Sequence, residues 1–150
     1  MTKKHPNPKT VMLLDSTLES LNALWERAET AFRKIHIPHE VYLRYAQTSP
    51  DGDYFENHFL GYVWLSGAWR ICQASAPADH EEDQLKWRSI RECRLDIRVA
   101  AANHLAELHK LISAEAEAYA KVVQRAEEAL RSAVEAIEME TSDGSDDVPF

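Results

Sequence analysis

The sequence predicts one α+β domain, built from an N-terminal amphipathic helix, a three-stranded antiparallel β-meander and a long C-terminal helical segment. Apolar residues recur at helical spacing over residues 18–35 and alternate at every second position over residues 40–74, and residues 95–139 contain neither glycine nor proline. The length of 150 residues fits a single domain. We expect both helical regions to cover one face of the sheet.

The two ends of the chain differ in composition from its middle. Residues 1–14 hold three lysines, two prolines and no acidic residue, which is typical of a flexible basic arm. Residues 140–150 are rich in serine and aspartate and have little to bury, so they are expected to form a disordered acidic tail. The folded domain is therefore predicted over residues 15–139.

The first helix is predicted to begin near Ser16, because residues 16–19 have the S-x-x-E form of a capping box. Charged residues such as Glu29 are expected to lie off its apolar stripe. The helix should end near His36, since Pro38 disfavours helical backbone at the residue before it. Apolar residues at steps of three and four form the stripe itself: Leu18, Leu21, Trp25, Ala28, Phe32 and Ile35.

Three strands are predicted from alternation with a period of two. The first begins near Glu40, and the turn-forming residues 49–52 separate it from a second strand over about residues 54–65. The Ser-Gly pair at residues 66–67 predicts a tight hairpin into the third strand, over residues 68–74.

The C-terminal segment is predicted to be helical from about Leu95, because alanine, glutamate and leucine dominate it. It is either continuous or broken near Ser113, where serine can compete for backbone hydrogen bonds. Its apolar stripe spans about three and a half heptads, which is the minimum for a coiled coil. The residues expected to mediate self-association are Ile112, Tyr119, Val123, Leu130 and Ile137.

Large aromatic side chains and an arginine flank the predicted hairpin. Residues of these types are enriched in the centres of protein interfaces, so this face of the sheet is a candidate partner-binding surface. Cross-strand aromatic packing that stabilises the sheet is the alternative interpretation. The candidate partner-binding residues are Tyr62, Trp64, Trp69 and Arg70.

A pocket between the sheet and the helices is the alternative to a partner-binding surface. Tyr42, His58 and Arg70 would then be the ligand-binding residues, because a few polar groups in an apolar hollow fix the orientation of a small ligand.

The sequence gives little support for catalysis, and we lean against an enzyme. It has no nucleophile motif, and its four glycines form no phosphate-binding loop, so no cofactor is predicted. His36 and His39 are interpreted as part of a helix end and not as a metal site. Cys72 and Cys93 are expected to pack as small apolar thiols, although the sequence leaves open whether they meet.

The net charge of −8 makes this an acidic protein. Residues 79–83 and the residues after Met139 carry −4 each, so the rest of the chain is neutral overall. The acidity is interpreted as a solubility feature, and direct nucleic-acid binding is disfavoured. No signal peptide or membrane span is recognisable, so a cytoplasmic location is expected.

These patterns predict a non-catalytic interaction protein of the adaptor or regulatory kind. It would form a homodimer through its long C-terminal helix and bind a protein partner by its aromatic sheet face. The first alternative is a small-ligand-binding or enzymatic pocket. A weaker alternative is an acidic decoy that occupies the basic surface of a nucleic-acid-binding protein.

Overall fold

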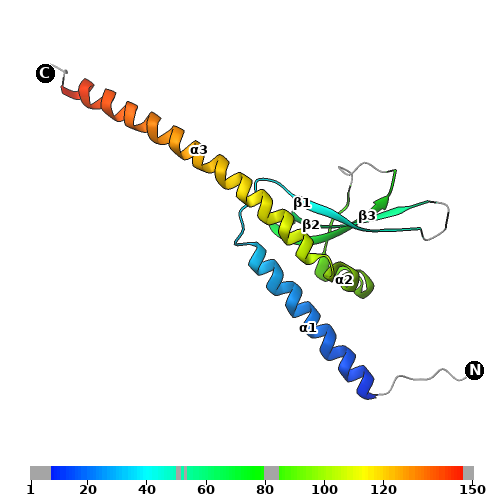
Figure 1. The fold of residues 1–150 in the computed structure, drawn as a ribbon. Helices are drawn as coiled ribbons and strands as arrows, with labels where there is room; N and C mark the ends of the chain where they lie inside the picture. Colours follow the sequence, from blue (N-terminus) through cyan, green and yellow to red (C-terminus); the bar gives the residue numbers. More distant parts are fainter. Residues whose placement is uncertain (1–7, 50–51, 53, 80–84, 147–150) are drawn as a thin grey trace, which may run out of the picture.

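The computed structural model describes residues 8–49, 52, 54–79 and 85–146, with residues 8–14 and 143–146 described by their backbone. It confirms an α+β fold with an N-terminal helix, an antiparallel sheet and a long C-terminal helix (Figure 1). The elements run in the order α1 (Pro8–Phe32), β1 (Val41–Thr48), β2 (Glu56–Leu65), β3 (Ala68–Pro77), β4 (Arg88–Ser89), the 3-10 helix η2 (Ile90–Glu92), α2 (Leu95–Ala102) and α3 (Leu105–Asp146).

The first and last helices extend beyond the bounds predicted from the sequence. Helix α1 begins at Pro8 and not near Ser16, because Val11 and Leu14 extend the helical spacing of the apolar residues upstream. Proline is well suited to the first turn of a helix, where its missing N–H would lack a partner. At the other end α3 continues to Asp146, past residue 139, where the helical segment was predicted to end. Residues 1–7 of the predicted arm, residues 80–83 of the acidic segment and residues 147–150 of the tail lie outside the described residues.

The sheet is an antiparallel meander in the order β1-β2-β3-β4. Ser66 and Gly67 form the predicted turn between β2 and β3, with φ angles of 52° and 83°. Two consecutive residues with positive φ are the pattern of a two-residue hairpin turn. The short strand β4 was not predicted, because two paired residues are too few to show alternation.

The hydrophobic core lies between the three helices and one face of the sheet, as the sequence predicted. Helix α1 contributes Trp25 and Phe32 from the predicted stripe. The start of α3 contributes Leu108 and Ile112, which are fully buried. The sheet contributes Val41 from β1, Leu60 and Tyr62 from β2, and Ile71 from β3.

Glu29 corrects one detail of the first helix, because it is buried instead of lying off the apolar stripe. It follows Trp25 by one helical turn and therefore shares its face. Its Oε1 accepts a hydrogen bond of 2.9 Å from the half-exposed Arg33. Its Oε2 has no hydrogen-bond partner among the described residues.

The C-terminal helical segment is broken at Asn103 and His104, not near Ser113. The chain leaves α2 through a tight turn in which the His104 N–H donates to the Ala101 carbonyl at 2.9 Å. Asparagine favours such helix ends because its side chain competes for backbone hydrogen bonds. Ser113 instead lies within α3, and its hydroxyl is 3.3 Å from Nε2 of His109.

Trp87 covers part of the second face of the sheet. Its ring lies over Gly61 of β2 and beside Tyr42 of β1, with a ring-centroid distance of 5.6 Å to Tyr42. A Cβ atom at Gly61 would lie 2.8 Å from Cη2 of Trp87, so this approach requires glycine.

Helix α3 is about 63 Å long at 1.5 Å per residue, and Figure 1 shows its C-terminal part extending far beyond the sheet. Ile112 is the last buried residue among the described side chains of the helix, and every side chain from residue 117 to residue 142 is exposed. No helix in the described part of the chain has both the length and the apolarity to cross a membrane.

Candidate functional site

The predicted partner-binding residues do not form one surface. Tyr62 is 1% exposed and packs edge-on against Phe32, with ring centroids 5.5 Å apart. Trp69 packs on Tyr62, and Trp64 meets Trp69 in a T-shaped contact at 6.0 Å. Arg70 lies on the opposite face of β3, where its Nε donates to the Leu65 carbonyl at 3.0 Å. Of the four residues, Trp64 alone is more than half exposed, at 56%.

The residues of the alternative ligand site are also separated. His58 lies on the face of the sheet that carries the helices, since it alternates in register with Leu60 and Tyr62. Tyr42 and Arg70 lie on the other face. These three side chains therefore cannot line one pocket.

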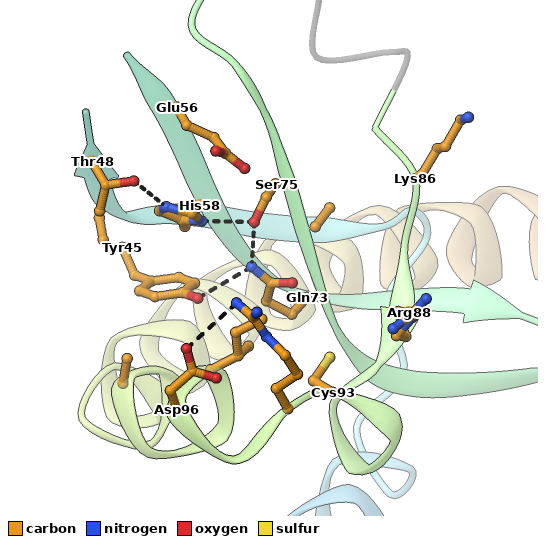
Figure 2. Close-up of a pocket in the computed structure, with 15 residues that line it drawn as sticks. Tyr45, Thr48, Glu56, His58, Gln73, Ser75, Lys86, Arg88, Cys93 and Asp96 are labelled. Carbon is orange, nitrogen blue, oxygen red and sulfur yellow. Dashed lines mark hydrogen bonds and ion pairs between the residues drawn. The ribbon is translucent and has the colours of Figure 1, made fainter. Parts of the chain in front are cut away.

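His58 does line a hollow, together with residues that the sequence did not single out. The hollow has a volume of about 680 Å³ and lies beyond the aromatic core, between the end of the sheet and α2 (Figure 2). Strands β1, β2 and β3 provide its polar floor, and α2 provides Ile97 and Ala100 as an apolar wall.

A chain of hydrogen bonds crosses the floor of this hollow (Figure 2). Nε2 of the buried Gln73 donates to the Tyr45 hydroxyl at 3.2 Å and to the Ser75 hydroxyl at 2.7 Å. Ser75 Oγ is 2.6 Å from Nδ1 of His58, and Nε2 of His58 is 2.7 Å from Thr48 Oγ1. One consistent proton order has Ser75 donating to Nδ1 and Nε2–H donating to Thr48. Burial also raises the pKa of Tyr45, which keeps its phenol protonated.

Three cationic side chains line the same hollow. Arg94 forms a weak ion pair with Asp96, with 3.5 Å between Nη2 and Oδ2. Lys86 and Arg88 form no ion pair with any described residue. Hydroxyl, amide and imidazole groups beside cationic side chains can together bind a small polar molecule that carries a carboxylate or phosphate group.

The pairing of His58 with Ser75 was missed in the sequence, although a signal for it existed. A two-residue hairpin pairs residues that are equally distant from its turn, so the Ser66–Gly67 turn determines the register of β2 and β3. Trp64 pairs with Trp69 in this register, and His58 pairs with Ser75. Side chains of directly paired residues lie on the same face of a sheet.

The two cysteines are free and buried, which agrees with their predicted packing as apolar thiols. Cys93 belongs to the core cluster and donates its thiol hydrogen to the Ser89 carbonyl at 3.4 Å. Burial raises the pKa of Cys72 to about 12 and also raises the pKa of Cys93. Neither thiol therefore has the thiolate character that a nucleophile or metal ligand needs.

The predicted self-association residues fall into two groups. Ile112 is fully buried in the core and cannot contact a second chain. The other four project from the body along one side of α3, with Leu130 at 65% and Ile137 at 61% exposure. They belong to an apolar stripe whose residues are separated by alternating steps of three and four positions: Ala116, Tyr119, Val123, Ala126, Leu130, Ala133 and Ile137.

Comparison of the chain with protein-family models, with curated proteins and with solved structures finds no match. No group of three or more metal-ligating side chains occurs within the described residues. The functional argument therefore depends on the geometry of this chain alone.

Proposed function

We propose that this protein is a non-catalytic interaction protein that self-associates through the projecting part of α3. The observation that carries this proposal is the apolar stripe of α3. It continues beyond the body of the protein, and no other described part of the chain packs against it there. Contiguous exposed apolar surface of this kind marks association sites in proteins.

The pattern of this stripe favours another helix as its partner. Its 3–4 spacing is the repeat by which two helices pack side by side. Ala120, Val122 and Val134 lie beside the stripe and widen it. Charged residues such as Lys121 and Glu128 occupy the opposite side, so the helix is amphipathic along its whole projecting length.

This proposal depends on α3 and not on the aromatic sheet face. Tyr62 is inaccessible, and Trp64 by itself is a small exposed surface. The decoy alternative depends mainly on acidic residues outside the described part of the chain, and no described cluster of acidic residues favours it.

Sedimentation equilibrium tests the proposal with a double substitution, Val123→Glu with Leu130→Glu. The wild type is expected at a multiple of the 17.1 kDa chain mass, and the variant at the chain mass itself. Two carboxylates in an apolar seam should weaken association by about 100-fold or more. Glutamate is a good helix former, so the circular dichroism signal should be retained.

Lys121→Glu is the matched control, because it changes the net charge by the same two units on the opposite side of α3. This control should associate like the wild type. A wild type that remains a monomer at high protein concentration would refute the proposal.

The hollow around His58 supports a second candidate function, the binding of a small anionic ligand. The observation in its favour is the hydrogen-bonded floor together with the cations of Lys86 and Arg88, which form no ion pair with a described residue. The shared chemistry of such ligands is a carboxylate or phosphate group that arginine can hold by two hydrogen bonds.

Thermal unfolding in the presence of inorganic phosphate or citrate tests this second candidate. A ligand at 100 times its dissociation constant stabilises the folded state by about 2.7 kcal/mol, which raises the melting temperature by several degrees. Arg88→Ala should abolish this increase. Arg91→Ala, in an exposed position outside the hollow, should retain it, and an equal loss in both variants would indicate unspecific charge effects.

A further inference from the structure

We infer that the hollow around His58 binds a doubly charged oxyanion and takes up a proton at His58 as the anion binds. This inference rests on the second candidate function, the binding of an anion in the hollow, and adds the charge of the ligand and its coupling to pH. It follows from the hydrogens available in the floor of the hollow and from the charges that line it (Figure 2).

The His58 ring lies between two hydroxyl groups, and in its neutral form it occupies the hydrogen of one of them. A neutral imidazole has one N–H donor and one acceptor nitrogen. If Nδ1 is the acceptor, Ser75 donates its hydrogen to Nδ1 across 2.6 Å, and Nε2–H donates to Thr48 Oγ1 across 2.7 Å. If Nε2 is the acceptor, Thr48 donates to it and the ring donates to Ser75. In either tautomer only one hydroxyl hydrogen remains for a ligand.

A protonated His58 ring releases both hydroxyl hydrogens. An imidazolium has two N–H donors and no acceptor, so Ser75 and Thr48 both accept from it. Ser75 can do so because a hydroxyl oxygen has two lone pairs, of which Gln73 Nε2 occupies one at 2.7 Å. Both hydroxyl groups can then donate to an anion in the hollow. Since the anion binds the protonated form better, its binding in turn favours protonation of the ring.

The charge of the hollow changes with the same proton. Three cationic and two acidic side chains line it, so their formal charges sum to +1 with neutral His58 and to +2 with protonated His58. A doubly charged oxyanion is therefore matched in charge by the protonated site. Cationic side chains bind such oxygens by charge-assisted hydrogen bonds. The five side chains are Lys86, Arg88, Arg94, Glu56 and Asp96.

The other titratable groups around the ring do not share its two hydroxyl partners. Glu56 of β2 and Asp96 of α2 line the hollow, but neither bonds to a floor hydroxyl among the described residues. Burial raises the pKa of Tyr45 and of Cys93, which keeps both groups neutral. His104 of α3 packs on Tyr45 with ring centroids 5.4 Å apart, but it does not line the hollow. The coupling between anion and proton is therefore assigned to the ring that bridges the two hydroxyl groups.

Isothermal titration calorimetry of the full chain with sodium sulfate tests this inference. Sulfate keeps its two charges throughout the pH range in which histidine titrates, whereas a phosphate monoester changes its own charge near pH 6. At constant ionic strength, sulfate should bind about 10-fold or more tightly at about pH 5.5 than at about pH 8, the effect of one more hydrogen bond to a charged group. Titrations in buffers of different ionisation enthalpy should show uptake of up to one proton per sulfate.

Three variants assign this proton to its group. His58→Gln should abolish both the proton uptake and the pH dependence of sulfate affinity. His36→Gln is the matched control, because His36 is exposed and does not line the hollow, so it should behave like the wild type. The double substitution Thr48→Val with Ser75→Ala keeps the ring but removes both hydroxyl groups, and it should lose most of the pH dependence. Full pH dependence in this double variant would overturn the role of the hydroxyl groups.

Two further anions test the assigned charge and the class of ligand. Nitrate carries one charge and should bind more weakly than sulfate, and an equal affinity would overturn the assignment of a doubly charged ligand. Oxalate also keeps two charges in this range, so its affinity relative to sulfate distinguishes a dicarboxylate from a phosphate-like or sulfate-like ligand.

The two ways in which the experiment can fail are distinguishable. Sulfate binding that is lost in Arg88→Ala but does not depend on pH would refute the proton coupling and leave the anion site intact. Absence of binding by sulfate and oxalate at every pH would instead refute the second candidate function itself.

Discussion

Replacing Tyr62 with alanine is expected to lower the free energy of unfolding by about 3–5 kcal/mol, the range for removing a large buried ring. The ring is fully enclosed and joins two layers of the core. Phe32 of α1 meets it edge-on, and Trp69 of β3 packs on it with a centroid distance of 5.3 Å. Its removal would leave a cavity that the sheet and helices cannot close. Urea denaturation followed by tryptophan fluorescence measures this loss.

Tyr62→Phe separates the ring from its hydroxyl group. Phenylalanine keeps both aromatic contacts, so it should change stability by at most about 1 kcal/mol. Both variants should be compared at one protein concentration, because association stabilises the folded state by mass action. A loss below about 1 kcal/mol for Tyr62→Ala would contradict the role assigned to this ring.

The sequence predicted those elements that local patterns determine. The stripe through Trp25 and Phe32 was recognisable because helical burial repeats every three or four residues. The hairpin was recognisable because Ser66 and Gly67 supply the turn and the flanking residues alternate. In both cases the residues that define the pattern are close in sequence.

The features that the sequence did not reveal depend on tertiary packing. Glu29 is polar, yet it is buried because the position one helical turn after Trp25 faces the same neighbours. The helix break at Asn103 was indistinguishable from one at Ser113, because both side chains compete for backbone hydrogen bonds. Packing decides between these two positions for the break. Leu108 and Ile112 both reach the core from one continuous α3, so the break must lie before them.

In the candidate sites, too, some features follow from local sequence patterns and others depend on tertiary packing. The repeat through Val123 and Leu130 is visible in the sequence, and only their exposure needed the structure. The hollow combines β1, β2, β3 and α2, which no local pattern brings together. Within it, the pairing of His58 with Ser75 was deducible from the hairpin register, whereas the approach of Arg88 depends on the unpredicted strand β4.

Replacing Gly61 with alanine is expected to destabilise the fold by about 2 kcal/mol, a typical cost of overpacking. The added Cβ would lie 2.8 Å from Cη2 of Trp87 and 2.9 Å from Cβ of Tyr42. The tryptophan ring can move, but the Tyr42 Cβ is attached to the backbone of β1. Part of the strain should therefore remain even after the ring has shifted. Equilibrium denaturation of the single variant measures the total cost.

A double-mutant cycle with Trp87→Ala separates the two contacts of Gly61. Without the indole ring, alanine at position 61 should cost about 1 kcal/mol less than in the wild type, because only the Tyr42 contact remains. The size of this coupling reports how firmly Trp87 is held on the second face of the sheet. Equal costs in both backgrounds would mean that Trp87 does not lie over Gly61 in solution. A larger cost without the ring would mean that Trp87 accommodates the extra methyl group, which contradicts the close approach in the structure.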